Sequence, residues 1–252
     1  MTTYREEAVV LRKVDYGEAD RIYTLLTRHH GKLGAIAKGV RRTSSRMGPS
    51  LEIFGQVDVL LAQGHNLDVV AQAERRGCPR MGAEVERTSY AGLVAELVER
   101  ATEERTPVEP IYELTCAALD ELAREADPRR ASAYFLAAFL ELFGYAPQLA
   151  TCVGCDAGLR PEPAAFRAAM GGFLCPRCAE GGSDPSQPLV SPGAIKVLRL
   201  IAAGDLATYR RLLLERARLD EIEQVLWAQL EHHLDRRLKS LQFIKQMRGS
   251  HR

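Results

Sequence analysis

The sequence predicts an α+β protein of several domains, in which a five-stranded β-barrel precedes a helical domain that carries a four-cysteine zinc module. Short runs of β-branched and apolar residues fill the first 76 positions, and helical periodicity begins at about residue 81. Two Cys-x2-Cys pairs follow between later helices. We expect the barrel to span 1–80, the helical domain 81–150 with 183–248, and the cysteine module 151–182.

The N-terminal third contains five runs that indicate strands, separated by turn residues. Five short strands in so few residues suit a small closed barrel, and the OB-fold is the five-stranded barrel most often used on oligonucleotides. A Tudor or SH3-like barrel stays open as the alternative, because strand number does not separate these folds. The expected strands are Glu7–Val14, Ile22–Thr27, Lys32–Val40, Glu52–Gln63 and Leu67–Glu74.

Apolar residues at helical spacing predict helices on both sides of the cysteine module. Leu93 and Leu97 share one face of the first helix, and Pro110 marks the start of the second. Ser191 followed by Pro192 is typical of a helix N-terminus. The further expected helices are Ile111–Ala126, Ala131–Phe143, one from Pro192 through Leu200, Tyr209–Ala217, and a long final helix with a buried stripe from Leu219 to Ile244.

The cysteine pairs predict a metal site. Nineteen residues separate the pairs, and Gly154 and Pro176 suit the tight turns that aim two sulfurs at one ion. Four thiolates leave no open position on zinc, so we expect a structural ion without chemistry of its own. Disulfides or redox turns are the alternatives, but no secretory signal precedes residue 30, which favours a reducing cytosol. The expected zinc ligands are Cys152, Cys155, Cys175 and Cys178.

Charge is unevenly distributed along the chain. Residues 1–80 carry a net charge of +4 and residues 81–252 a net charge of −3, and residues 21–51 contain no acidic side chain. Such a run makes a local positive field that attracts polyanions. The longest apolar stretch, Ala131–Ala146, is interrupted by Glu141 and is too short to cross a bilayer, so we expect no membrane role.

Cations, glycines and small hydroxyl residues alternate between residues 31 and 46, a combination that suits contacts to phosphate. A solvated hairpin with a basic loop is the alternative. Tyr16 and Phe54 could stack on bases, but aromatic residues in strand-like runs are more often part of the core, where we expect both. The candidate contact residues are Lys32, Lys38, Arg41, Arg42 and Arg46, with Arg21 added less securely.

Several motifs occur in a distinctive order along the chain. They are Tyr16–Ile22, Leu26-Thr27 with Gly31-Lys32, Ala37–Arg42, Ser45-Arg46 and, near the C-terminus, the segment 236–240. Together they resemble the bacterial recombination mediator family RecO over nearly the whole chain.

The resemblance implies an OB-fold domain that binds single- and double-stranded DNA and, in some members, a zinc-bound cysteine module. It implies proteins that anneal complementary strands and, with RecR, help RecA load onto strands coated by single-strand-binding protein. It carries the DNA-facing role to the six cations Arg21, Lys32, Lys38, Arg41, Arg42 and Arg46. We expect a bacterial cytoplasmic, nucleoid-associated protein that is not an enzyme. The sequence holds no Gly-x4-Gly-Lys-Ser/Thr motif, so we expect no nucleotide site.

Two functions of other classes stay open. An RNA-binding or ribosome-associated zinc protein also fits a barrel with a thiolate site. A zinc-dependent nuclease would need histidine and carboxylate ligands, for which His232, His233 and Asp235 are the candidates.

Overall fold

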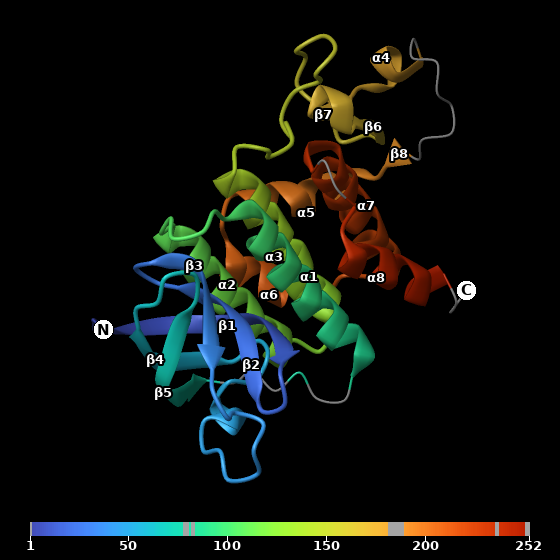
Figure 1. Cartoon of the computed structure of the whole chain (residues 1–252). Coiled ribbons are helices and arrows are strands. Elements are labelled where there is room, and N and C mark those ends of the chain that lie inside the picture. Colours follow the sequence, from blue (N-terminus) through green and yellow to red (C-terminus); the bar gives the residue numbers. More distant parts are fainter. Residues whose placement is uncertain (1, 78–80, 82–83, 181–188, 235–236, 250–252) are drawn as a thin grey trace. The chain divides into compact units, whose positions relative to one another are not determined.

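The computed structural model describes residues 2–77, 81, 84–180, 189–234 and 237–249 (Figure 1). Contacts divide the chain into two compact units, Met1–Pro128 with Leu238–Arg252, and Arg129–Arg237. The three domains expected from the sequence stay a prediction, and the boundary between 182 and 183 lies outside the described residues.

The first unit is built on a closed five-stranded barrel. Its strand order is β1-β2-β3-β5-β4, with β1 paired to β4 and with β3 and β5 parallel, which confirms the predicted OB-fold. The observed strands are β1 (Thr3–Tyr16), β2 (Asp20–Thr27), β3 (Gly31–Ala37), β4 (Gln56–Ala62) and β5 (Asp68–Gly77), and a short 3-10 turn, η1, spans Gly48–Ser50.

Alternating side chains fill the barrel. Tyr23, Leu25 and Leu33 are buried inside, and their neighbours along each strand point outward. A bulge between Val10 and Arg12 shifts the register of β1 against β2, and beyond it β1 continues past the core to a hairpin tip at Tyr16. The strand therefore carries its last residues away from the packed interior.

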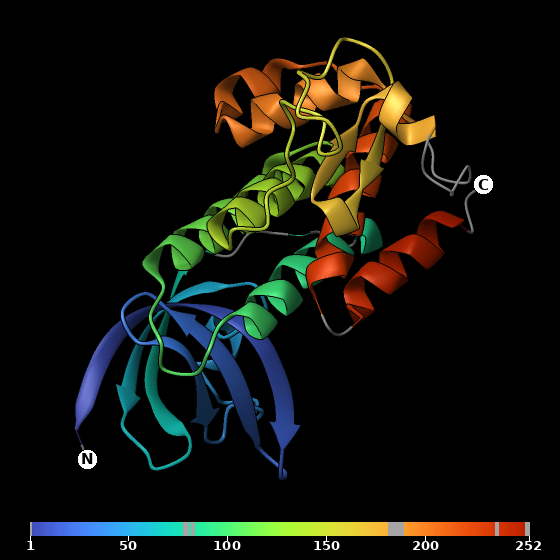
Figure 2. The ribbon, with the colours of Figure 1, turned by 90° about the horizontal axis from the view of Figure 1, so that it is seen from above.

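Three helices complete this unit: α1 (Val85–Ala101), α2 (Glu109–Arg124) and α8 (Lys239–Gly249). α1 buries Tyr90, Leu93 and Leu97, and α8 lies beside it (Figures 1 and 2). The predicted helix Ile111–Ala126 is confirmed to within two residues at each end by α2.

The prediction of one long final helix is wrong. The segment forms two helices, α7 (Arg216–His233) and α8, and the backbone at Leu234 is extended. The apolar spacing runs through the break, so periodicity could not reveal it. α8 begins afresh because the Glu96 carboxylate accepts hydrogen bonds from the backbone N–H groups of Lys239 at 3.0 Å and Ser240 at 2.8 Å.

The second unit contains α3 from Arg129 onward, α5, α6 and α7 together with a small sheet. The Ser191 hydroxyl accepts from the N–H of Ala194 at 3.3 Å, which confirms the predicted cap of α5. The predicted helix Tyr209–Ala217 is wrong, because α6 ends at Arg211 and α7 begins only at Arg216. The remaining elements are α3 (Pro128–Leu142), β6 (Ala164–Arg167), η2 (Ala168–Met170), β7 (Gly172–Leu174), α4 (Pro176–Glu180), β8 (Leu189–Val190), α5 (Pro192–Ala202) and α6 (Leu206–Arg211).

An ion pair stabilises the helices of the second unit from inside. Buried Arg129 donates to Glu223 and to Asp220, each at 2.7 Å, so two carboxylates of α7 compensate the guanidinium. None of the described helices is long and apolar enough to cross a membrane.

Glu96→Gln should weaken the attachment of α8. Burial raises the pKa of Glu96, but hydrogen bonds from Ser240 and Lys239 and the charge of Arg100 outweigh it and lower the pKa below its ordinary 4.5. The carboxylate therefore contributes stability above that pH and loses it as pH falls through the lower folded value. We expect about 1–2 kcal/mol less unfolding free energy at neutral pH, measured by urea denaturation.

Urea denaturation of the same proteins at low pH supplies a second test. Wild type and Glu96→Gln should converge in stability as acid protonates the carboxylate, whereas Glu103→Gln, at an exposed position just after α1, should match wild type at every pH. Equal stability of wild type and Glu96→Gln at neutral pH would contradict this role.

Candidate nucleic-acid interface and metal centre

The loop at residues 38–46, here called the basic loop, lies against the turn between β1 and β2. The backbone N–H of Arg41 donates to the carbonyl of Ala19 at 2.9 Å, and the N–H of Gly39 donates to the Asp20 carboxylate at 2.7 Å. Gly17 and Gly39 both adopt positive φ, which glycine allows without strain. Two sequence motifs, Tyr16–Ile22 and Ala37–Arg42, thus form one substructure at one end of the barrel (Figure 1).

Three of the predicted contact residues are exposed on this loop without a protein partner. Lys38, Arg42 and Arg46 face solvent, and none has a hydrogen-bond or ion-pair partner among the described residues. Arg41 is also exposed, but its guanidinium donates to the carbonyl of Gly17 at 3.2 Å and lies 3.5 Å from Asp15. The anchored backbone therefore holds uncompensated cations in place.

Arg21 belongs to the hairpin beside the basic loop. Its guanidinium donates to Asp15 at 2.7 Å, and this hydrogen bond lowers the pKa of Asp15 against the effect of burial. Arg21 and Arg41 together neutralise that carboxylate. Glu18 at the turn is exposed and adds a negative charge there.

Lys32 has a different position. Its ammonium donates to the carbonyls of Glu99 and Thr102, both at 2.5 Å, where α1 ends. These carbonyls have no partner inside the helix, and the negative end of the helix dipole favours a cation there. Gly31 is fixed by packing, because a Cβ would stand 2.3 Å from the carbonyl oxygen of Thr106. The motif Gly31-Lys32 thus joins the barrel to its helices.

The two aromatic residues expected in the core behave differently. Phe54 is buried, at 6 % exposure, but Tyr16 is 55 % exposed, so the prediction is wrong for Tyr16. Tyr16 directly precedes Gly17 at the hairpin tip, beyond the packed part of β1. This position beside a turn glycine was the signal in the sequence that placed it outside.

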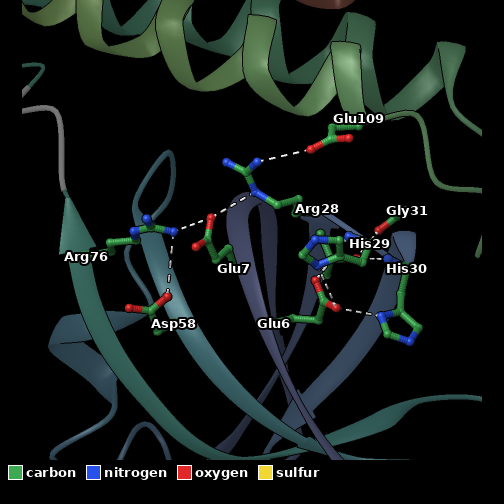
Figure 3. A network of polar contacts seen from close by, with 10 residues as sticks. Glu6, Glu7, Arg28, His29, His30, Gly31, Asp58, Arg76 and Glu109 are labelled. Carbon is green, nitrogen blue, oxygen red and sulfur yellow. Dashed lines mark hydrogen bonds and ion pairs between the residues drawn. The ribbon is translucent and has the colours of Figure 1, made fainter.

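Another cation of the acid-free run, Arg28, is neutralised by carboxylates that are distant in the sequence. Arg28 pairs with Glu7 at 2.9 Å and with Glu109 at 3.2 Å (Figure 3). It also pairs with Glu113 at 2.5 Å. A hydrogen bond from Arg76, with help from Arg28, lowers the pKa of Glu7 against the effect of burial. Sequence distance concealed these carboxylates, which come from β1 and α2.

Buried Glu6 organises the neighbouring turn between β2 and β3. Its carboxylate accepts from the backbone N–H of His29 at 3.2 Å and lies 2.6 Å from the Nδ1 of His30 (Figure 3). A pocket of about 250 Å³ beside it is lined by more acidic than basic residues: Arg5, Glu6, Glu7, His29, Asp58, Val59, Leu60, Gln72 and Glu74. This outer face is unsuited to a polyanion, in contrast to the basic loop.

The four predicted metal ligands come together. The sulfurs of Cys152, Cys155, Cys175 and Cys178 all lie within 4.8 Å of one another, and those of Cys155 and Cys175 are 3.9 Å apart. Zinc bonds of about 2.3 Å in a tetrahedron separate sulfurs by about 3.8 Å, so the spacing fits. Gly154 is required locally, because a Cβ would stand 2.9 Å from the Leu174 side chain.

Backbone groups favour thiolate character at the buried sulfur. Burial raises the pKa of Cys152, but N–H groups of Cys175, Gly154 and Cys155 outweigh it and lower the pKa to about 6. Hydrogen bonds with the sulfurs of Cys155 and Cys175 raise the pKa of Cys178 to about 12. A divalent ion favours deprotonation of all its thiol ligands, so the donor set is compatible with zinc.

The alternative histidine site lacks a comparable arrangement. His233 stacks on Tyr145 with ring centroids 4.3 Å apart and contacts Gln229, and Asp235 lies outside the described residues. Within the described ranges, the cysteine quartet is the only group of three or more ligand side chains close enough to hold a metal.

Comparison with known proteins identifies close relatives of the whole chain. The model of the recombination protein O N-terminal region matches residues 1–77, and that of the C-terminal region matches residues 83–242. A protein of Bifidobacterium longum named DNA repair protein RecO is 37% identical over 249 residues, covering 97% of this chain and 99% of the relative. Proteins of the same name are 38% identical over 248 residues in a Nocardioides species, covering 96% and 99%, and 33% identical over 252 residues in Desulfatibacillum aliphaticivorans, covering 97% of each.

Lys32→Met and Lys38→Met should separate a structural cation from an exposed one. Lys32→Met leaves the α1 carbonyls without their donor, and we expect a loss of about 1–3 kcal/mol of unfolding free energy. Lys38→Met removes no internal contact and should leave stability unchanged while lowering affinity for single-stranded DNA. Urea denaturation and fluorescence anisotropy measure the two effects; a stable Lys32→Met variant with reduced DNA affinity would contradict the assignment.

Proposed function

The chain belongs to the RecO family of DNA repair proteins, and we propose that its OB-fold barrel binds single- and double-stranded DNA through the basic loop. The family assignment supports a role in DNA repair and recombination. The observation that carries the proposal is the group of exposed, unpaired cations Lys38, Arg42 and Arg46 on a loop anchored by backbone hydrogen bonds.

The chemistry of this loop suits the sugar–phosphate backbone more than base identity. Guanidinium and ammonium groups bind phosphate oxygens, and the glycine and hydroxyl residues among them add N–H and O–H donors. Binding through phosphate is independent of sequence and weakens steeply with salt. Such binding suits a protein that acts at any gap or break. Arg41 takes part with the part of its guanidinium that faces solvent, and Arg21 holds the hairpin beside the loop in shape. Lys32 mainly ties the barrel to α1.

We further propose that the protein is a mediator without a catalytic site. Cations that screen two strands lower the repulsion between them, so the surface can promote annealing without breaking a bond. Family membership supports a role with RecR in helping RecA load onto strands coated by single-strand-binding protein. A pull-down with purified RecR, combined with a strand-annealing assay, tests this part.

The competing functions make different demands. The zinc-dependent nuclease requires metal-dependent cleavage of DNA by the purified protein, and an RNA-binding protein must prefer RNA over single-stranded DNA of equal length. No observation in the described residues favours either one. We place the protein in the bacterial cytoplasm at the nucleoid, because its proposed ligand is there.

The cysteine quartet, we propose, holds one structural zinc ion. The ligands would be Cys152, Cys155, Cys175 and Cys178. The ion would fix the turn that carries the first cysteine pair against β7 and α4. A closed set of four sulfurs excludes substrate, so the metal contributes stability to the second unit only. The sulfur spacing and the compartment proposed above support zinc over disulfides.

The combined variant Lys38→Gln, Arg42→Gln and Arg46→Gln should lose DNA affinity through lost phosphate contacts. Each lost contact removes about 0.7 from the slope of log K against log salt on single strands, so we expect the slope to fall by about 2. Anisotropy titrations at several salt concentrations measure the slope. The same variant should anneal complementary strands more slowly.

Arg124→Gln is the matched control, since Arg124 is an exposed cation on α2 with only a 4.0 Å pair to Asp120. It should leave the slope unchanged. Wild-type affinity and slope in the triple variant would overturn the proposed interface.

Cys175→Ser should lose bound zinc and lower the melting temperature. If the lost site costs about 3 kcal/mol, the midpoint falls by about 6–12 °C in a chain of this size. Single-stranded DNA affinity should stay at the wild-type level, because the cations belong to the other unit. Metal analysis and calorimetry measure the first two effects.

Cys116→Ala serves as the control, because Cys116 lies on α2 outside the quartet. It should keep its zinc. A wild-type protein prepared without chelators that contains no zinc would refute the metal assignment.

A further inference from the structure

An apolar surface lies on the outside of the barrel next to the basic loop. Val14 is 45 % exposed and Tyr16 55 % exposed, and they lie two residues apart on one face of β1. Across the sheet Val14 is opposite Ile22, and Ile22 is opposite Ile36 on β3. Ile22 and Ile36 are half-buried, whereas Tyr23 and Ala35, the next cross-strand pair, point into the core. We call Val14, Tyr16, Ile22 and Ile36 the apolar row.

The basic loop contacts residues that directly adjoin this row. Arg41 donates to the carbonyl of Gly17, the residue after Tyr16, at 3.2 Å. Gly39 donates to Asp20, the residue opposite Tyr16 in the β1–β2 register, at 2.7 Å. Lys38 follows Ile36 by two residues at the end of β3. An exposed aromatic ring and its apolar neighbours thus stand beside cations that are anchored to the same hairpin.

This combination selects one class of occupant. A protein partner that binds through apolar contacts would not need the unpaired cations beside the row. A DNA duplex presents phosphates to those cations, but its stacking hides the faces of the bases. A single strand offers phosphates for the loop and open base faces for an aromatic ring, and proteins that bind single strands combine these two features. Tyr16 brings a large ring whose apolar body costs little to order on binding.

We propose that Tyr16 stacks on an unpaired base of single-stranded DNA while the basic loop binds the adjoining phosphates. The inference rests on the proposed function and deepens it, because it gives the barrel a way to prefer single over double strands. The half-buried Ile22 and Ile36 extend the apolar contact behind the ring. The phosphates give affinity for any DNA, and the tyrosine adds affinity for strands whose bases are accessible.

Tyr16→Ala should weaken single-strand binding by about 5- to 150-fold, the range for one lost stacking contact. Binding to a fully paired hairpin duplex should change less than twofold, and the salt slope should stay at the wild-type value, because no phosphate contact is lost. Tyr16→Phe should bind like wild type. Anisotropy with a labelled mixed-sequence strand and the duplex measures all three.

Tyr16→Trp supplies a direct signal of stacking. The chain has one tryptophan, Trp227, which is buried, so new fluorescence in Tyr16→Trp that is quenched by single-stranded DNA reports contact at position 16. Phe243→Ala is the control for loss of an exposed aromatic ring, since Phe243 on α8 is 49 % exposed, and it should leave both affinities unchanged. Calorimetry should show wild-type melting for Tyr16→Ala, because the side chain is exposed.

The outcomes separate this inference from the proposed function. If the triple loop variant loses DNA but Tyr16→Ala binds single strands normally, the loop interface holds and stacking is refuted. An equal loss of single- and double-strand affinity in Tyr16→Ala, or unquenched Tyr16→Trp, also refutes stacking. If Tyr16→Ala loses RecR while keeping single-strand affinity, the row is a protein surface and the inference is overturned. Normal DNA binding by the triple variant overturns the proposed function itself.

Discussion

The proposed interface depends on the backbone hydrogen bonds that hold the basic loop to the β1–β2 hairpin. Like charges on a flexible loop repel one another and would spread it over many conformations. The bonds from Arg41 to Ala19 and from Gly39 to Asp20 use no cationic side chain, so they fix the loop without consuming its charge. Asp15 offsets part of the remaining repulsion through Arg21 and Arg41. Position and charge are thus supplied by different groups.

The cations of the first fifty residues have two roles, one structural and one exposed to solvent. Arg28 and Lys32 face carboxylates or helix carbonyls and connect the barrel to α2 and α1. Lys38, Arg42 and Arg46 face solvent. In the sequence all five belong to one acid-free run, and charge alone does not separate them. Only pairing across long sequence separations, as between Arg28 and Glu109, reveals which ones are compensated.

The sequence predicted the barrel because alternation and turns are local signals, and it predicted the cysteine cluster because the spacing of ligands is itself a geometric constraint. It failed where tertiary contacts decide. The start of α8 depends on a glutamate far away in α1, and the strands of the small sheet β7-β6-β8 are too short to carry a pattern. The prediction for Tyr16 failed because it rests on the usual burial of aromatic residues in strand-like runs, which does not tell how far a strand extends past the packed interior. The contact roles of the individual cations stay predictions.

A binding surface for annealing has to satisfy two opposed requirements. It must hold a strand strongly enough to screen its charge, yet leave most bases free to pair with the second strand. Phosphate contacts meet the first requirement without touching the bases, which is why the cations far outnumber the exposed aromatic residues at this end of the barrel. One stacking residue at the hairpin tip, as proposed for Tyr16, would engage a single base and leave the neighbouring bases free to pair. A row of several exposed aromatic residues would bind single strands more tightly but would compete with pairing. The exposed tyrosine and the anchored cations therefore suit transient capture of a strand better than permanent coating.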